Sequence, residues 1–127
     1  MVDKKILVIG NEIAFESVGR FLFPQALGVY DVVNYSGVQS QSGRTADYSS
    51  EAITAVINQH GANYSAILVD LVERQAAQAA RDAGFTKPII GIGSHPSDQI
   101  AGADIVLAFR SGTDTSILRK TLDKLVK

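Results

Sequence analysis

The sequence of 127 residues contains no cysteine, which excludes disulfide bonds, thiolate metal sites and a cysteine nucleophile. It also lacks a long apolar run, because stretches such as residues 6–9 and 66–69 are far shorter than the about 20 residues that a bilayer span needs. An excess of one charge is missing as well: the formal net charge is −1, which creates no overall field to attract nucleic acid or an anionic membrane. We therefore expect a cytoplasmic protein that binds neither nucleic acid nor membrane directly and recognises its partner through a local surface.

The composition indicates one domain over residues 1–127. Apolar residues make up 46% of the chain and charged residues 20%, as is typical of a soluble globular protein. No Pro- or Gly-rich linker divides the sequence. A chain of this length can bury roughly two thirds of its unfolded surface in a single core.

Short apolar runs alternate with segments of helical period about five times along the chain. This alternation predicts strands at 5–10, 30–36, 64–70, 87–93 and 104–109, and helices at 11–28, 50–61, 73–84 and 111–127. The polar stretch 36–50 is expected to be a loop, and 94–103 is either a short helix or a loop. The last helix is expected to turn four apolar side chains inward: Ile117, Leu118, Leu122 and Leu125.

The alternation predicts an α/β fold: a single (βα)5 doubly wound parallel sheet with helices on both faces. Because parallel crossovers are right-handed, covering both faces needs a strand order such as 2-1-3-4-5, which reverses between the first and third strands. Ligands of such sheets bind at the carboxyl ends of the strands beside this reversal. The polar residues expected there are Asn11, Glu12 and Asp70, with Ser94 and Arg110 as outer neighbours.

Asp70 has two readings. It ends an apolar strand at the position that the topology favours for chemistry, so it is a candidate reactive carboxylate. It also precedes Glu73 by three residues, which fits an acidic variant of the capping box at the start of a helix. Asn11 and Glu12 admit the same pair of readings, since Asn caps helices and Glu favours the first helical turn.

The order of "KILVIGNE", "AILVD", "KPIIGIGS" and "GADIVLAF" before a final amphipathic helix resembles the receiver domain of bacterial response regulators. In that family an acidic pair after the first strand holds Mg²⁺ and an Asp ending the third strand accepts a phosphoryl group. A Thr or Ser ends the fourth strand and a Lys ends the fifth. The resemblance places the candidate phosphoacceptor at Asp70.

The other motif positions depart from the family pattern. The acidic pair falls on Gly10 and Asn11 with Glu12 beside it, the hydroxyl position falls on Gly93, and the lysine position falls on Phe109. The chain therefore looks like a degenerate receiver, or pseudo-receiver, in which phosphorylation at Asp70 is impaired or absent. If phosphorylation is retained, Glu12 and Asp70 are the candidate Mg²⁺ ligands; otherwise no cofactor is expected.

The resemblance implies a partner surface on the segment 94–103, the fifth strand and the last helix. Its candidate residues are Phe109, Arg110, Arg119, Lys120 and Lys124. The expected partner is a protein: a kinase, an output domain of a longer regulator such as a transcriptional activator, or a second copy in a homodimer.

The preferred function is thus a non-enzymatic regulatory domain of two-component signal transduction that acts through protein–protein contacts. A working Mg²⁺-dependent receiver of a phosphorelay is the alternative, and a small nucleotide- or ligand-binding domain of flavodoxin-like fold is a third. The 36–50 loop, with Arg44 and Tyr48, would lie near the Asp70 site and could cover it.

Overall fold

A computed structural model describes residues 5–10, 30–35, 48–71, 73–93, 97–108 and 116–126. The predicted helix at 11–28 lies outside these residues. The strands are β1 (Lys5–Ile9), β2 (Asp31–Asn34), β3 (Tyr64–Asp70), β4 (Ile89–Gly93) and β5 (Ile105–Ala108). The helices are α3 (Ser50–His60), the 3-10 turn η2 (Gly61–Asn63), α4 (Gln75–Asp82) and α5 (Ser116–Leu125).

The five strands form one parallel sheet in the order β2-β1-β3-β4-β5, which confirms the predicted order. β1 pairs with both β2 and β3, so the point at which the strand order reverses lies beside β1, as expected. Next along the sheet, Asp70 at the end of β3 is paired in register with Ile92 of β4. The carboxyl ends of β1, β3 and β4 therefore lie at one edge of the sheet.

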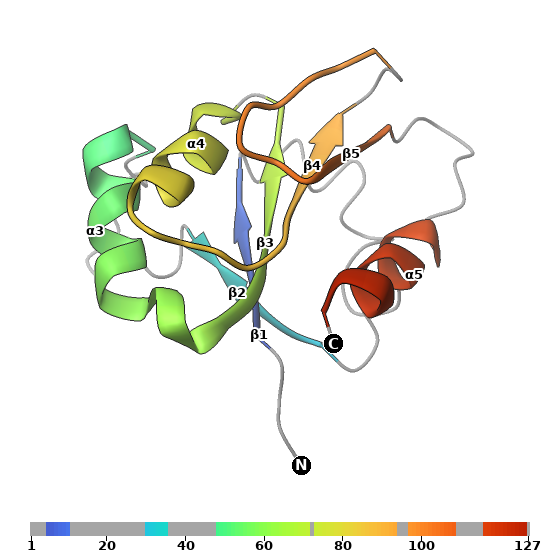
Figure 1. Cartoon of the computed structure of the whole chain (residues 1–127), viewed down its shortest axis with the longest axis horizontal. Coiled ribbons are helices and arrows are strands. Elements are labelled where there is room, and N and C mark those ends of the chain that lie inside the picture. The colour runs from blue at the N-terminus through green and yellow to red at the C-terminus, as the bar shows by residue number, and fades with distance from the viewer. Residues whose placement is uncertain are drawn as a thin grey trace.

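Helices cover both faces of the sheet: α3 and α4 lie on one side and α5 lies on the other (Figure 1). Alternation along β3 divides the core in the same way. Ala66 and Leu68 join the cluster that contains Leu118 and Leu122 of α5. Ile67 and Val69 belong to the cluster on the α3 and α4 side. Both clusters are built on fully buried strand residues, which is why the strands read as continuous apolar runs.

The helix α3 is bounded by Ser49 and Gly61. Ser49 is the N-cap, and its hydroxyl accepts a hydrogen bond from the amide of Ala52 at 3.2 Å. α3 ends at His60 and Gly61 is its C-cap, but the φ of Gly61 is −55°, a right-handed value that does not require glycine, and the chain continues into the separate 3-10 turn η2. Its small size is explained by packing instead, since a Cβ there would lie 3.1 Å from the Ile57 side chain. Gly84, which follows α4, does have a left-handed backbone, with φ 96°.

The connection between β4 and β5 contains no helix over its described residues, 97–104, so this part of the predicted helix or loop is a loop. It packs closely on its neighbours because two glycines leave room for it. A Cβ on Gly91 would lie 2.6 Å from Ile100 of the connection. A Cβ on Gly102, whose φ is 91°, would lie 2.8 Å from the backbone of Ala77 in α4.

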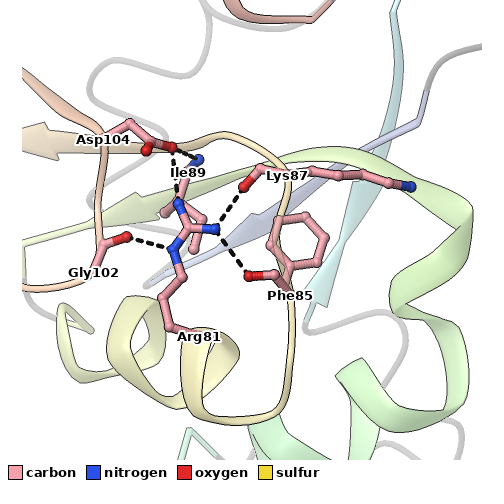
Figure 2. Close-up of polar contacts among 6 residues, drawn as sticks. All are labelled: Arg81, Phe85, Lys87, Ile89, Gly102 and Asp104. Atoms are coloured by element: carbon pink, nitrogen blue, oxygen red, sulfur yellow. Dashed lines mark hydrogen bonds and ion pairs between the residues drawn. The ribbon is translucent and has the colours of Figure 1, made fainter.

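Arg81 ties α4 to the amino end of the sheet (Figure 2). Its guanidinium also forms an ion pair with Asp104 at 2.8 Å, and Asp104 accepts the amide of Ile89 at the start of β4. The guanidinium donates to three backbone carbonyls at 2.8–2.9 Å, those of Phe85, Lys87 and Gly102.

The prediction for the last helix was partly wrong. Leu118 and Leu122 are fully buried, but Ile117 is 45% exposed and Leu125 is 38% exposed. The reason is that the buried seam of α5 follows residues 118 and 122 and ends at Val126, which leaves Ile117 and Leu125 on a flank.

Among the helices that the structure describes, none has the length and apolarity to cross a membrane.

Candidate functional site

Asp70 is the last residue of β3, at the carboxyl edge of the sheet where the topology predicts a site. Its exposed fraction is only 4%, although it is charged by type. Its Oδ1 accepts a hydrogen bond from the backbone amide of Glu73 at 2.7 Å. This three-residue bond is the contact that the capping reading predicts for an Asp at this position.

The rest of the capping box does not follow the predicted pattern. The Glu73 carboxylate accepts from the side chain of Gln75 at 2.8 Å. The helix α4 begins at Gln75, with Arg74 as an N-cap that makes no side-chain capping bond. Asp70 therefore closes the turn that precedes α4, and the helix starts two residues later than the sequence predicts.

At the end of β1, the carbonyl of Gly10 accepts the hydroxyl of Tyr48 at 2.7 Å. The Tyr48 ring lies 5.2 Å from the ring of Tyr35, and its carbonyl accepts from Gln75 at 3.2 Å. Tyr48 thus joins the end of the polar stretch 36–50 to β1 and to α4. Glu12, the predicted second metal ligand, and Asn11 lie outside the described residues.

At the end of β4, a side chain of the following connection occupies the space beside Gly93. A Cβ built on Gly93 would lie 2.8 Å from Oδ2 and 3.0 Å from Cβ of Asp98. Position 93 is where the receiver resemblance expects a hydroxyl side chain. Here a carboxylate from five residues along the chain lies in its place. Ser94, the neighbouring hydroxyl, lies outside the described residues.

The predicted interaction residues are distributed over two flanks of α5. Arg119 lies 3.9 Å from Asp123, which accepts the Tyr30 hydroxyl at 2.5 Å. Burial and the hydrogen bond to Asp123 raise the pKa of Tyr30 to about 12. Lys120 and Lys124 are exposed on another part of the helix. Phe109 and Arg110 lie outside the described residues.

The described side chains do not fit a magnesium site. Over these residues, no group of three or more His, Cys, Asp or Glu is arranged to hold a metal ion. Mg²⁺ needs near-octahedral oxygen ligation. The described oxygens at this edge belong to Asp70, whose Oδ1 accepts the Glu73 amide, to the Gly10 carbonyl, which accepts the Tyr48 hydroxyl, and to Asp98 beside Gly93.

A groove of about 650 Å³ is lined by residues of α4, of the turn before it and of the β4–β5 connection. Apart from the buried Ile100, its lining is mostly exposed and polar; the lining residues are Arg74, Gln75, Gln78, Gln99, Ile100 and Ala101. Small-molecule sites are usually concave and largely apolar, with a few converging polar groups. This groove therefore gives little support to the ligand-binding alternative.

Comparison with solved structures relates the whole chain to one fold. The chain superimposes on the receiver domain of the sensor histidine kinase PA1611 from Pseudomonas aeruginosa PAO1 with a TM-score of 0.61. The match covers 98% of this chain and 98% of that chain. This protein has a receiver-domain fold. The PA1611 receiver carries a magnesium ion coordinated in its active-site cleft.

The sequence comparisons give no family. No protein-family model and no curated protein sequence matches the chain. The sequence identity between the PA1611 receiver and this chain is 16%, so the similarity shows the fold alone. Because one fold hosts many functions, the function has to be argued from the receiver fold together with the residues at its edge.

Proposed function

We propose that this receiver-fold domain is a non-enzymatic regulatory domain that acts by binding a protein partner, and that Asp70 maintains the fold instead of accepting a phosphoryl group. One observation carries the proposal: the Asp70 carboxylate is 4% exposed and bonded to the Glu73 amide at 2.7 Å. A phosphoacceptor must present an oxygen in line with the incoming phosphorus. Here Oδ1 of the carboxylate instead accepts the amide that closes the following turn.

The surroundings of Asp70 support the same proposal. Phosphoryl transfer depends on positive or hydrogen-bond-donating groups that neutralise the charge developing on the equatorial oxygens. At the end of the neighbouring strand, the space beside Gly93 holds the Asp98 carboxylate, which is a negatively charged hydrogen-bond acceptor. A carboxylate there would repel a phosphoryl group instead of stabilising it.

The alternative is a working Mg²⁺-dependent receiver of a phosphorelay, in which Glu12 and Asp70 bind the metal. It needs the Asp70 carboxylate to leave the Glu73 amide and to meet ligands from residues that the described part of the chain does not include. One observation supports this alternative: the PA1611 receiver, which has the same fold as this chain, coordinates a magnesium ion in its active-site cleft.

Exposure to a small-molecule phosphodonor tests the choice. The purified chain is incubated with acetyl phosphate and MgCl₂ and its intact mass is measured, beside Asp70→Asn as the matched control. We expect no added phosphoryl group in either protein. Incorporation of one phosphoryl group by the parent chain and none by Asp70→Asn would contradict the proposal and establish the alternative.

A further inference from the structure

We infer that the α4 groove binds the C-terminal end of a partner polypeptide, with Arg74 receiving the terminal carboxylate and with Gln75 and Gln78 accepting its backbone N–H groups. The α4 groove is the space of about 650 Å³ lined by Arg74, Gln75, Gln78, Gln99, Ile100 and Ala101. The inference rests on the proposed function, because it names the surface and the chemistry through which a protein partner is bound.

The two walls of the groove come from elements that pack closely together. One wall is the exposed stripe of α4 and of the turn before it, because Arg74 and Gln78 are four residues apart and Gln75 lies beside them. The other wall is the β4–β5 connection, in which Gly102 closely approaches the backbone of Ala77. α4 lies on one side of the sheet and α5 on the other (Figure 1). The lining residues belong to neither β5 nor α5.

Two carboxamides of the groove keep their oxygens for a ligand. The Gln75 Nε2 donates to the Glu73 carboxylate at 2.8 Å and to the Tyr48 carbonyl at 3.2 Å. The Gln78 Nε2 donates to the Asp82 carboxylate at 2.9 Å. Because a carboxylate or a carbonyl can only accept a hydrogen bond, the nitrogen of each carboxamide has to face it. Each oxygen is left without a donor among the described residues, so both glutamines can accept N–H groups of a ligand.

Arg74 supplies the positive charge of the groove. Its side chain is exposed, and its Nη1 donates to the Leu71 carbonyl at 3.3 Å. Arg74 forms no ion pair with a described residue, and none of the described lining residues is acidic. A guanidinium can bind a carboxylate through two parallel N–H groups, so the groove favours a ligand with a carboxylate.

The surrounding charges limit the ligand to a single carboxylate. Glu73 and Asp82 are bonded to two glutamines of the groove and therefore lie close to it. They would repel a run of acidic side chains, whereas the guanidinium of Arg74 can neutralise one carboxylate. The C-terminal end of a polypeptide offers one carboxylate directly preceded by backbone N–H groups. This combination matches one cation beside two acceptors.

The remaining lining favours polar contacts over apolar ones. Ile100 is only 5% exposed and packs toward Gly91 of β4, so the groove offers little apolar surface beyond the exposed Ala101. Gln99 is exposed and forms no hydrogen bond with a described residue, so its carboxamide can both donate and accept. A peptide backbone supplies the polar groups that such a lining needs, and small side chains are sufficient.

A pair of short alanine peptides provides the test. Both are acetylated at the amino end; one ends in a free carboxylate and the other in a carboxamide. Each is titrated into the isotope-labelled chain, and amide shifts are followed by NMR. We expect the free carboxylate to shift the amides of residues 74–78 and 99–101 saturably. It should bind at least about tenfold more tightly than the carboxamide, because the carboxamide lacks the charge-assisted hydrogen bonds.

Three variants separate the roles of the guanidinium and the carboxamides. Arg74→Gln and Arg119→Gln change the net charge equally, but only Arg74→Gln is expected to remove the preference for the free carboxylate. Gln78→Ala removes an acceptor of backbone N–H groups, so it should weaken the binding of both peptides by a similar factor and keep the preference. All three side chains are exposed, so the spectrum outside the groove should be preserved.

Absence of binding, equal affinity for the two peptides, saturable shifts outside the groove, or a preference that survives in Arg74→Gln would overturn the inference. A third peptide ends in a carboxamide and carries one internal glutamate. If it bound as tightly as the free carboxylate, the ligand would be an acidic side chain and not a C-terminal end. Shifts of the groove amides on concentrating the free chain would overturn the inference in favour of a second copy.

The peptide titration does not involve Asp70. Phosphorylation of Asp70 would therefore contradict the proposed function alone, and failure of the peptide titration would contradict the role of the α4 groove alone.

Discussion

The two ends of the parallel sheet use their charged side chains in different ways. At the amino end, Arg81 binds carbonyls and a carboxylate as far as 23 residues away, and Lys87 donates to the Tyr64 carbonyl at 2.8 Å. At the carboxyl end, Asp70 accepts the amide of Glu73 three residues along the chain, and the long-range hydrogen bonds there come from the neutral side chains of Tyr48 and Gln75. The amino end is therefore held by long-range contacts that join separate elements, and the Asp70 contact shapes one turn.

This difference predicts where the free energy of unfolding is most sensitive. Loss of a long-range contact frees two elements that the chain does not otherwise hold together. Loss of the Asp70 contact frees one turn, whose neighbours remain fixed by β3 and α4. Substitutions on the amino side and in the β4–β5 connection should accordingly cost more than substitutions of Asp70.

The largest effect is expected for Gly102→Ala. The change adds a Cβ 2.8 Å from the Ala77 backbone at a residue with φ 91°. We expect a loss of about 3 kcal/mol in the free energy of unfolding, from left-handed strain and displacement of the connection. Gly84→Ala is the matched control, because its φ is 96° and a Cβ would meet nothing within 4 Å. It should cost only about 1 kcal/mol. Equal losses in urea unfolding would show that the close approach to α4 contributes nothing.

Arg81→Lys is expected to have the next largest effect. Lysine keeps the charge but cannot donate to the separated carbonyls that the guanidinium reaches at once. We expect a loss of about 2 kcal/mol, mainly from the carbonyl contacts, since the Asp104 side chain is 46% exposed and its ion pair is screened by water. Arg119→Lys, at an exposed pair, should change the stability by less than about 0.5 kcal/mol. Urea unfolding of both variants measures the difference, and similar values would remove the special role of the amino end.

Asp70 should tolerate substitution according to its capping role. Asn can accept the Glu73 amide as Asp does, so Asp70→Asn should change the stability by less than about 0.5 kcal/mol. Asp70→Ala removes the acceptor and should cost about 1 to 2 kcal/mol. The same unfolding measurement decides: an Asn variant as unstable as the Ala variant would mean that the carboxylate charge, and not the cap, is what the turn requires.

Tyr30 gives a smaller, pH-dependent effect. Its pKa is raised from 10.0 to about 12, mainly by burial and then by the hydrogen bond to Asp123. Because the folded state favours the neutral phenol, this contribution is complete below pH 10 and is lost as the pH rises toward 12. At neutral pH, Tyr30→Phe should cost about 1 kcal/mol through the lost hydrogen bond. Burial also raises the pKa of Tyr64, so the ultraviolet absorbance of tyrosinate should show more than one titration step above pH 10, and one of them should disappear in Tyr30→Phe. Loss of no such step would argue against the α5–Tyr30 contact.

The sequence predicted the sheet well because its signals are local. Buried parallel strands appear as continuous apolar runs, and the handedness of crossovers then leaves few possible strand orders. The hydrogen bond between Asp70 and the Glu73 amide could also be predicted, because a three-residue spacing of Asp and Glu is typical of a helix cap.

Other features have no comparable signal. The Arg81 guanidinium donates mainly to backbone carbonyls. Every residue has a carbonyl, so the sequence does not indicate which residues accept these hydrogen bonds. The Tyr48 contact with Gly10 and the approach of Asp98 to Gly93 depend on how segments distant in sequence or separated by a loop come together. The exposure of Ile117 and Leu125 depends on how α5 is rotated about its axis. The sequence does not determine this rotation, because the apolar positions of the helix cover a wider face than the one that is buried.

The central claim is that Asp70 caps a turn and does not operate a phosphorylation switch. It is tested most directly by following the amide NMR spectrum while Mg²⁺ and then beryllofluoride, which mimics an aspartyl phosphate, are added to the parent chain and to Asp70→Asn. We predict that the amides of Gly10, Asp70, β5 and α5 keep their positions at millimolar metal. Saturable shifts that begin at Gly10 and Asp70, extend to α5 and vanish in Asp70→Asn would contradict the account.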